Sequence, residues 1–146
     1  MRTNSLIRWK KIKMLKLEKI LIYFTIPAFF FMFHMFLDLV FDIYDKLPWF
    51  SSVMHFAGGA ILAFTFFSLL NYLNREKYFI SDKFTRFVFT ISLIGLFGIL
   101  WEFYEFTIVN IFDLNWNMAY NDTIWDLFVD LIGGILASVW FLARKN

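Results

Sequence analysis

Acidic side chains at helical spacing have the clearest capacity for chemistry in this sequence. Glu102 and Glu105 are separated by one helical turn, as are Asp126 and Asp130, and Asp122 continues the second stripe. Residues three or four positions apart share one face of a helix, so each set would present its carboxylates in one direction. Carboxylates grouped in this way can transfer protons or hold a cation.

Both histidines of the chain occur in stretches that could join these acids. His34 begins a stripe that continues through Asp38, Asp42 and Asp45, and His55 lies in a separate apolar stretch. Carboxylates combined with one or two imidazoles suit Mg²⁺, Mn²⁺ or Zn²⁺, and the mixture does not decide among these ions. The chain has no cysteine, which excludes thiolate ligands and thiolate chemistry.

The amino-acid composition indicates whether the segments that carry these residues are surrounded by water or by lipid. Of the 146 residues, 60% are hydrophobic and 18% are charged, whereas a soluble domain is about 45–50% apolar and about 25% charged. A membrane-crossing helix needs about 20 mostly apolar residues, and four stretches meet this need: 20–41, 53–72, 87–106 and 124–142. The sequence therefore predicts an all-α membrane protein, in which a basic segment (1–19) precedes a bundle of four transmembrane helices (20–146).

Lysine and arginine are concentrated on one side of these predicted spans. Of the 14 basic residues, only Lys46 lies in the first or third connector, and the others occupy 1–19, 73–86 and the end of the chain. Cytoplasmic loops are enriched in Lys and Arg, so both termini are predicted to lie in the cytoplasm. The segment 1–19 either only directs this topology or forms an interfacial helix on anionic lipids, and neither interpretation involves nucleic acid.

The acidic residues are polarised in the opposite direction. Glu18, Glu76 and Asp82 lie on the basic side, and the rest lie in the outer half of a span or in an outer connector. A charged side chain costs about 2.5–3.5 kcal/mol at the centre of a spanning helix, so these groups should turn inward. With Lys46 as the only outer lysine, either several carboxylates are protonated or a bound cation neutralises them. We favour a divalent cation.

This hypothesis assigns a role to each residue. The candidate metal ligands are His55, Glu102, Asp122 and Asp126. The candidate catalytic residues are His55 as a general base and, for proton transfer, Glu105 and Asp130. The residues expected to surround the site are His34, Asp38, Asp45 and Tyr104. For each acid taken alone, a structural role in capping a helix or bonding Trp or Tyr is an equally simple interpretation.

Small residues and proline indicate how the spans pack. Gly58-Gly59, Gly95-x-x-Gly98 and Gly133-Gly134 are expected to let helix backbones approach closely. Pro27 is expected to kink the first span, because proline cannot donate the backbone hydrogen bond of a continuous helix.

Motifs in three of the spans resemble a known family, the YjdF-like inner-membrane proteins, which are small polytopic proteins related to the VanZ-like group. The resemblance covers roughly 48–140 and rests on His55-Phe56-x-x-Gly59, Trp101-Glu102-x-x-Glu105, Asp122-Thr123-x-Trp125-Asp126 and Gly133. The family places an Asp-basic pair shortly before the histidine, where this chain has Ser51 and Ser52, so Asp38 or Asp45 is the candidate substitute. The association of VanZ-like proteins with glycopeptide resistance implies a site near the outer leaflet and the lipids of the cell envelope.

Three functions are compatible with these residues. The first is a metal-dependent hydrolase or transferase, embedded in the inner (cytoplasmic) membrane, that binds or acts on an outer-leaflet lipid or a lipid-linked substrate. The second is a cation- or proton-coupled transporter or channel subunit, although the inner half of each span is almost free of ionisable groups. The third is a non-catalytic envelope accessory protein that binds a partner through 107–121. No His-Glu-x-x-His or Gly-x-Ser-x-Gly motif occurs, so no enzyme class is indicated.

Overall fold

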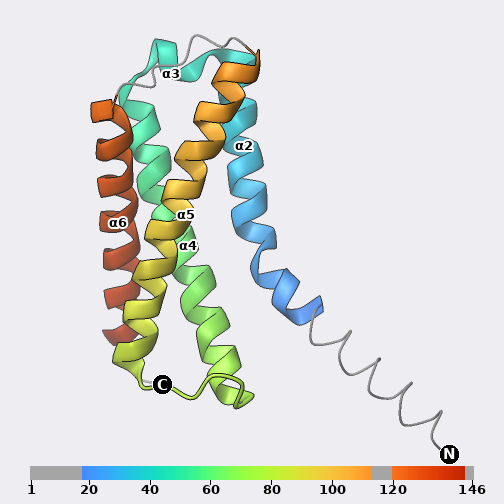
Figure 1. Cartoon of the computed structure of the whole chain (residues 1–146), viewed down its shortest axis with the longest axis vertical. Helices are drawn as coiled ribbons and strands as arrows, with labels where there is room; N and C mark the ends of the chain where they lie inside the picture. The colour runs from blue at the N-terminus through green and yellow to red at the C-terminus, as the bar shows by residue number, and fades with distance from the viewer. Residues whose placement is uncertain (1–17, 113–119, 144–146) are drawn as a thin grey trace, which may run out of the picture.

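The computed structural model describes residues 18–112 and 120–143, except for the side chains of Asp45 and Tyr120. In chain order its elements are α2 (Thr25–Phe41), α3 (Ile43–Lys46), α4 (Trp49–Arg75), α5 (Lys83–Phe112) and α6 (Tyr120–Ala143) (Figure 1). All regular structure in these ranges is helical, which confirms the predicted all-α class. Nearly all of the predicted basic segment, 1–19, lies outside the described residues.

Three helices in the described ranges are long and apolar enough to cross a membrane. They are Trp49–Arg75, Lys83–Phe112 and Asn121–Ala143, each with a mean hydropathy of 1.8. At about 1.5 Å of rise per residue, each is longer than the roughly 30 Å hydrocarbon core of a bilayer. They contain the second, third and fourth predicted spans. The first predicted span corresponds to α2, an apolar helix of 17 residues, and to the helical residues 18–23 before it.

The first predicted span is interrupted just before Pro27. Residues 18–23 and α2 are both helical, but Phe24 forms a turn between them. Pro27 cannot donate a hydrogen bond to the carbonyl of Tyr23, and its ring would crowd that carbonyl in a continuous helix. The kink expected from Pro27 is therefore present, at the turn that precedes the proline.

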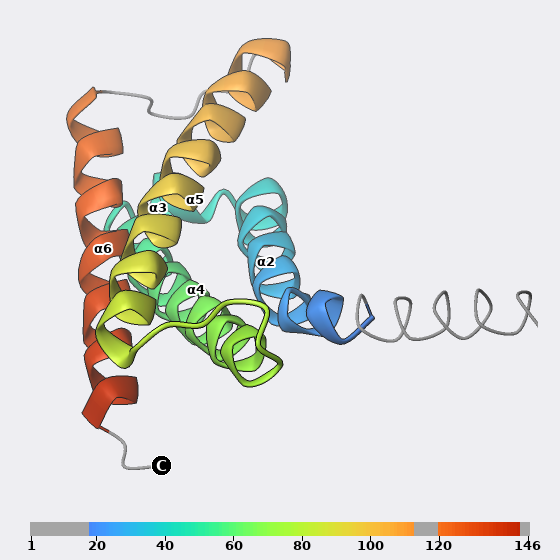
Figure 2. The same ribbon diagram turned by 60° about the horizontal axis from the view of Figure 1, so that its bottom comes forward.

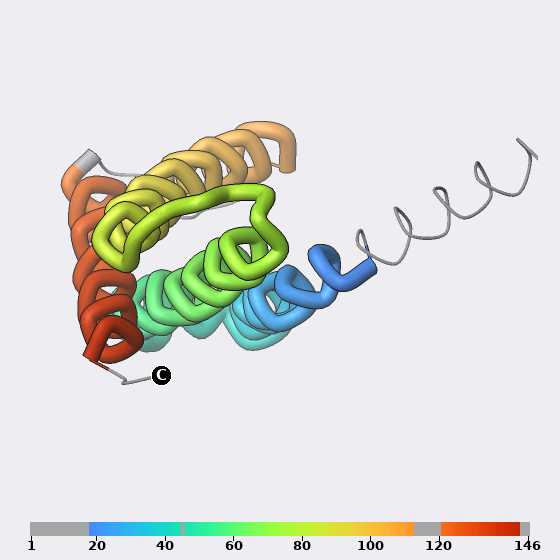
Figure 3. Tube along the Cα trace, turned by 90° about the horizontal axis from the view of Figure 1, so that it is seen from below, coloured from blue at the N-terminus to red at the C-terminus, as the bar shows by residue number. Residues whose placement is uncertain are grey.

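Helix α4 is the centre of the bundle. It packs against α2, α3, α5 and α6, and α5 also packs against α6. Figures 2 and 3 show α4 between α2 on one side and the α5–α6 pair on the other. In the described part of the chain, α2 makes no close backbone approach to α5 or α6. Helix α2 is thus held to the bundle by backbone-level packing on α4 and α3, and it meets α5 through side chains, such as the ring of Phe31 on Trp101.

The backbones of α4 and α6 are in contact where they cross. A Cβ atom added to Gly59 would overlap the carbonyl oxygen of Asp130, and one added to Gly133 would overlap the carbonyl oxygen of Phe56. Only glycine allows this approach, which confirms the predicted role of small residues in packing these helices. The crossing places Asp130 directly against the helix that carries His55.

From this crossing the apolar core continues toward the C-terminal end of α4. The outside of the bundle is also apolar. Leu62, Ala63 and Phe66 of α4 pack with Ile94 of α5 in a fully buried cluster. Around it, large apolar side chains are exposed on every long helix, for example Phe29, Met32 and Leu136. An exposed apolar surface of this extent is expected where lipid surrounds the protein.

Candidate functional site

His55 lies between two aspartates of the neighbouring helix α6. Its Nδ1 atom is 3.4 Å from Asp130 Oδ2, and its Nε2 atom is 3.5 Å from Asp126 Oδ2. All three side chains are buried, with at most 6% of each residue exposed. A neutral imidazole carries a single N–H and can donate to only one of these carboxylates. The arrangement therefore requires a second proton on the imidazole, a proton on a carboxylate, or a cation between them.

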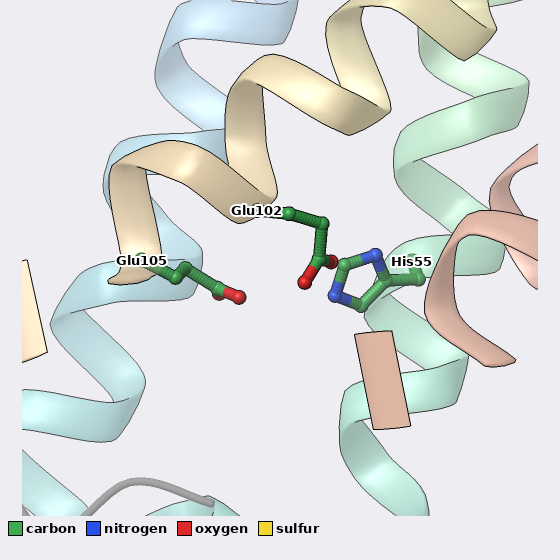
Figure 4. A group of neighbouring side chains, drawn as sticks. All are labelled: His55, Glu102 and Glu105. Atoms are coloured by element: carbon green, nitrogen blue, oxygen red, sulfur yellow. The ribbon is translucent and has the colours of Figure 1, made fainter. Parts of the chain in front are cut away.

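Two glutamates of α5 approach the same imidazole. Figure 4 shows the carboxylates of Glu102 and Glu105 directed toward His55 from the helix opposite. One donor atom of each of these three residues lies within 4.8 Å of the other two, so the group could hold a metal ion. The indole Nε1 of Trp101 donates a hydrogen bond to Glu105 Oε1 at 2.8 Å, and the side chain of Thr123 hydrogen-bonds to Glu102. Neighbouring side chains thus orient both glutamates.

Helix α2 contributes the second histidine and a further acid. His34 and Asp38 are one turn apart on α2, and both are buried. The His34 ring stacks on Trp101 with a centroid separation of 5.3 Å, and it meets the His55 ring edge-on at 6.2 Å. His34, one of the residues expected to surround the site, is therefore in ring contact with both Trp101 and His55.

Tyr44 of α3 is a member of the site that sequence reasoning missed. Its backbone N–H donates to Asp38 Oδ1 at 3.4 Å, and its ring lies edge-on to His34. Burial, followed by the charges of Asp38, Glu105 and Asp126, raises the pKa of Tyr44 above its ordinary value, so the hydroxyl keeps its proton. Helical spacing could not find this residue, because Asp42 ends α2 in a left-handed conformation, with φ of 47°.

We refer to these side chains together as the polar cluster: His34, Asp38, Tyr44, His55, Glu102, Glu105, Asp126 and Asp130. Within residues 18–112 and 120–143, four of its buried atoms have no hydrogen-bond partner: His34 Nε2, the Tyr44 hydroxyl oxygen, Glu102 Oε1 and Asp126 Oδ1. A buried polar atom left unpaired costs about 1–3 kcal/mol, so proteins normally pair such atoms with water, an ion or a ligand. The polar cluster therefore has binding capacity that the described residues do not use.

The remaining predicted site residues lie at the edge of the cluster or elsewhere. Asp122 is half-buried one turn before Asp126, within electrostatic range of Asp126 and Glu102. Glu105, assigned to proton transfer from the sequence, lies with His55 and Glu102 in the group whose donor atoms are within 4.8 Å of one another. The hydroxyl of Tyr104 lies 3.7 Å from the sulfur of Met35. The side chain of Asp45 lies outside the described part of the structure.

Two hollows adjoin the polar cluster. The smaller is a cavity of about 10 Å³ lined by His34, His55 and Asp130 among others, which is room for about one water molecule. The larger is a groove of about 400 Å³ between α2 and α5, with Leu62 of α4 at its base. Four side chains line both hollows and so form the wall between them: Phe31, Leu62, Phe97 and Trp101.

Comparison with known proteins adds relatives but no activity. The chain is 31% identical over 94 residues to an "Uncharacterized protein" of Thermotoga maritima. This alignment covers 63% of the chain and 47% of the relative, so the chain spans about half the length of the curated relative that it matches. No solved structure matches the chain. The family model described as "Predicted membrane protein (DUF2238)" matches residues 5–146, and the chain therefore belongs to this family of predicted membrane proteins.

Proposed function

We propose that this protein holds a divalent cation in the polar cluster and uses it to bind or act on an outer-leaflet lipid or lipid-linked substrate of the cell envelope. One observation carries the proposal. His55, Glu102 and Glu105 converge from two helices to within 4.8 Å, while Glu102 Oε1 is buried with no partner in the described part of the chain. An oxygen-rich group with one imidazole suits Mg²⁺, Mn²⁺ or Zn²⁺.

The balance of charge supports a bound cation. The polar cluster contains five acids, and His55 and His34 are its only bases. Packing several carboxylates into a low-dielectric environment is costly unless protons or a cation neutralise them. A divalent ion would neutralise two carboxylates at once, and it would also satisfy the unpartnered oxygens of Glu102 and Asp126.

The orientation of His55 supports the same assignment. Because Nδ1 faces Asp130, the opposite nitrogen, Nε2, is available on the side of Asp126. A ligating histidine usually donates its other N–H to a carboxylate, which fixes the ring and strengthens the ligand. Asp130 would then orient His55, and the candidate ligands would be His55, Glu102, Glu105 and Asp126.

The chemistry follows from these positions. A bound cation would polarise a phosphoryl or acyl oxygen of the substrate. Glu105, held by the Trp101 N–H, is placed to accept or return a proton at the edge of the donor group. The protonated hydroxyl of Tyr44 can donate a hydrogen bond to the same substrate. The enzyme class would be a hydrolase or a transferase.

The proposal includes a topology. Residues 18–41 would form a fourth crossing, both termini would lie in the cytoplasm, and the polar cluster would lie near the extracytoplasmic face of the inner membrane. The ends of α4 and α5 that carry Arg75 and Lys83 are the ends remote from His55 and Glu105, in accord with the positive-inside rule. Membership of DUF2238 is consistent with the YjdF-like resemblance, and a relation to VanZ-like proteins would accord with an outer-leaflet substrate.

Cation binding provides the direct test. Detergent-purified protein, stripped with a chelator, is titrated with Mn²⁺ while free Mn²⁺ is followed by electron paramagnetic resonance. We expect about one equivalent to bind, and Glu102→Gln to weaken binding at least about tenfold. The matched control is Glu76→Gln, the same change at an exposed residue at the other end of the bundle. Monodisperse wild-type protein that binds no Mn²⁺, Mg²⁺ or Zn²⁺ would contradict the proposal.

The absence of native cysteine makes the topology testable as well. Asn110→Cys lies at the end of α5 near the polar cluster, and Lys77→Cys lies beyond the other end of α4; both positions are exposed. We expect a membrane-impermeant maleimide to label the cysteine at 110 in intact spheroplasts and the cysteine at 77 only after lysis. The reverse pattern would place the polar cluster at the cytoplasmic face and contradict an outer-leaflet substrate.

A further inference from the structure

We propose that the groove between α2 and α5 receives one hydrocarbon chain of a membrane lipid whose anionic headgroup lies at the cation centre. This inference rests on the proposed function and names the substrate class of that site. We call the groove the α2–α5 groove; its walls include Pro27, Ala28 and Phe31 of α2 and Phe97, Leu100 and Trp101 of α5.

The α2–α5 groove is apolar and faces the surroundings of the bundle. Its volume of about 400 Å³ lies within the range of about 300–1,000 Å³ typical of ligand sites. Among the described residues the backbones of α2 and α5 make no close approach, so the helices stand far enough apart to leave the groove between them, and the rings of Phe31 and Trp101 that meet there form part of its lining. A chain in the bilayer could therefore enter laterally, without crossing a polar surface.

Trp101 joins the groove to the polar cluster. Its ring stacks on Phe31 at 4.7 Å and on His34 at 5.3 Å, and its N–H donates to Glu105. A single side chain thus lines the apolar groove with its ring and orients a candidate cation ligand with its polar edge. A hydrocarbon chain that followed this wall would end beside the carboxylates. An amphiphile fits a site of which one part is apolar and the adjoining part is polar.

The dimensions favour an extended chain over a helix of a partner. A helix with side chains is at least about 10 Å wide and rises about 5.4 Å per turn, so about 400 Å³ corresponds to roughly one turn. A partner helix would leave most of its length outside such a groove. An acyl or isoprenoid chain is narrow enough to lie within it. The acids of the cluster would repel a bare phosphate, so an anionic headgroup requires the cation.

Photocrosslinking with a defined lipid tests this inference. The probe is phosphatidic acid with a diazirine in one acyl chain, added to the Mn²⁺-loaded protein in nanodiscs, and adducts are located by peptide mass spectrometry. We expect saturable adducts at Leu62, which is 3% exposed and lies at the base of the groove, where surface lipid cannot reach it. Removing Mn²⁺ should lower this labelling at least about threefold, because the headgroup then loses its counter-charge.

A matched pair of variants locates the binding site. Ala28→Trp fills the groove from its α2 wall, where the space accepts a larger side chain, and it should lower the Leu62 adduct at least about fivefold while Mn²⁺ still binds. Ala143→Trp makes the same change at an exposed position of α6, outside the groove, and should leave the adduct unchanged.

The outcomes separate this inference from the proposed function. Wild-type protein that binds Mn²⁺ but is labelled only at outward-facing residues such as Leu136 and Val139 would overturn the inference and leave the cation site standing. Saturable Leu62 adducts in a protein that binds no cation would overturn the proposed function and the headgroup assignment, and would support a lipid chain in the groove. Dimers crosslinked through Ala28→Cys would show that a second copy covers the groove and would overturn the inference.

Discussion

The two sides of α4 differ in how closely the neighbouring helices approach. On one side, α6 meets α4 backbone to backbone at Gly59 and Gly133. On the other side, α2 lies against α4 and leaves a groove of about 400 Å³ between itself and α5. The close side holds His55 against Asp126 and Asp130 in one geometry. On the open side, the wall that includes Phe31 and Trp101 separates the groove from the cavity beside His55. Tight packing and open space thus belong to different helix pairs.

Side-chain size accounts for this difference. Glycines at the α4–α6 crossing leave no side chain to separate the backbones, and the gain is close van der Waals packing. Along the other side, rings of Phe31, Phe97 and Trp101 stand between the helices. Aromatic rings are too wide to allow close backbone approach, so the space between α2 and α5 is bounded by rings rather than filled.

The largest effect is expected at the close side. Gly59→Ala should lower the free energy of unfolding by about 3 kcal/mol, because the added methyl overlaps the carbonyl of Asp130 and the helices must separate. Gly95→Ala is the matched control, since a Cβ there meets only Leu131 at an ordinary 3.8 Å. It should change stability by less than about 1 kcal/mol, in the stabilising direction. Thermal unfolding in detergent measures both, and equal stabilities for the two variants would remove the contrast between tight and ordinary packing.

An intermediate effect is expected at the wall between the groove and the polar cluster. Trp101→Phe keeps an aromatic ring and removes the N–H that donates to Glu105, so it should cost about 1.5 kcal/mol of stability. It should also weaken Mn²⁺ binding about tenfold, since a candidate ligand loses its orienting partner. Trp49→Phe, at an exposed ring, should change neither quantity. An unchanged Mn²⁺ affinity in Trp101→Phe would show that this residue of the groove wall does not influence the cation site.

The smallest effect is expected at the start of α5, the helix that borders both regions. Asp82 Oδ1 accepts a hydrogen bond from the backbone N–H of Thr85, and this contact lowers the pKa of Asp82 below its ordinary value of 3.8. A lowered pKa means that the contribution to stability is complete above about pH 4 and is lost as the pH falls through the folded-state value. Asp82→Ala should therefore be less stable than wild type at pH 7, and the difference should shrink below pH 4.

Equilibrium unfolding at a series of pH values measures this difference. Because Asp82 is exposed and far from Gly59, its loss should not alter the effect of Gly59→Ala in the double variant. Strong coupling between the two changes would mean that the start of α5 and the α4–α6 crossing do not behave as separate regions.

Much of the candidate site could be predicted from helical spacing in the sequence. The rest depends on how the helices cross and on where a helix ends, which spacing does not determine. Glu102 with Glu105, and Asp126 with Asp130, each lie on one uninterrupted helix, so their common direction could be predicted from spacing. Helical spacing cannot rank Asp122 against Glu105 as a neighbour of His55, because that distance depends on how α5 and α6 cross. Tyr44 lies beyond the left-handed residue Asp42, where the helical register is lost.

The role of the glycines could also be predicted only in part. Each glycine pair could be assigned to packing from the sequence, but the sequence could not show that Gly59 and Gly133 meet carbonyl groups while Gly95 meets a side chain at an ordinary distance. The α2–α5 groove was not predictable at all, since it arises from two helices whose described backbones do not approach closely and from aromatic rings that leave space between them.

Lys46 is the only lysine or arginine between Lys19 and Arg75. Its ammonium group donates to the carbonyl oxygen of Phe41 at 2.5 Å, at the carboxyl end of α2. There it opposes the partial negative charge of the helix end. Within residues 18–112 and 120–143, no lysine or arginine is thus paired with the buried acids of the polar cluster, and their neutralisation would be left to mobile species. The cations and protons of the medium on that side of the membrane would then act as structural components of this fold.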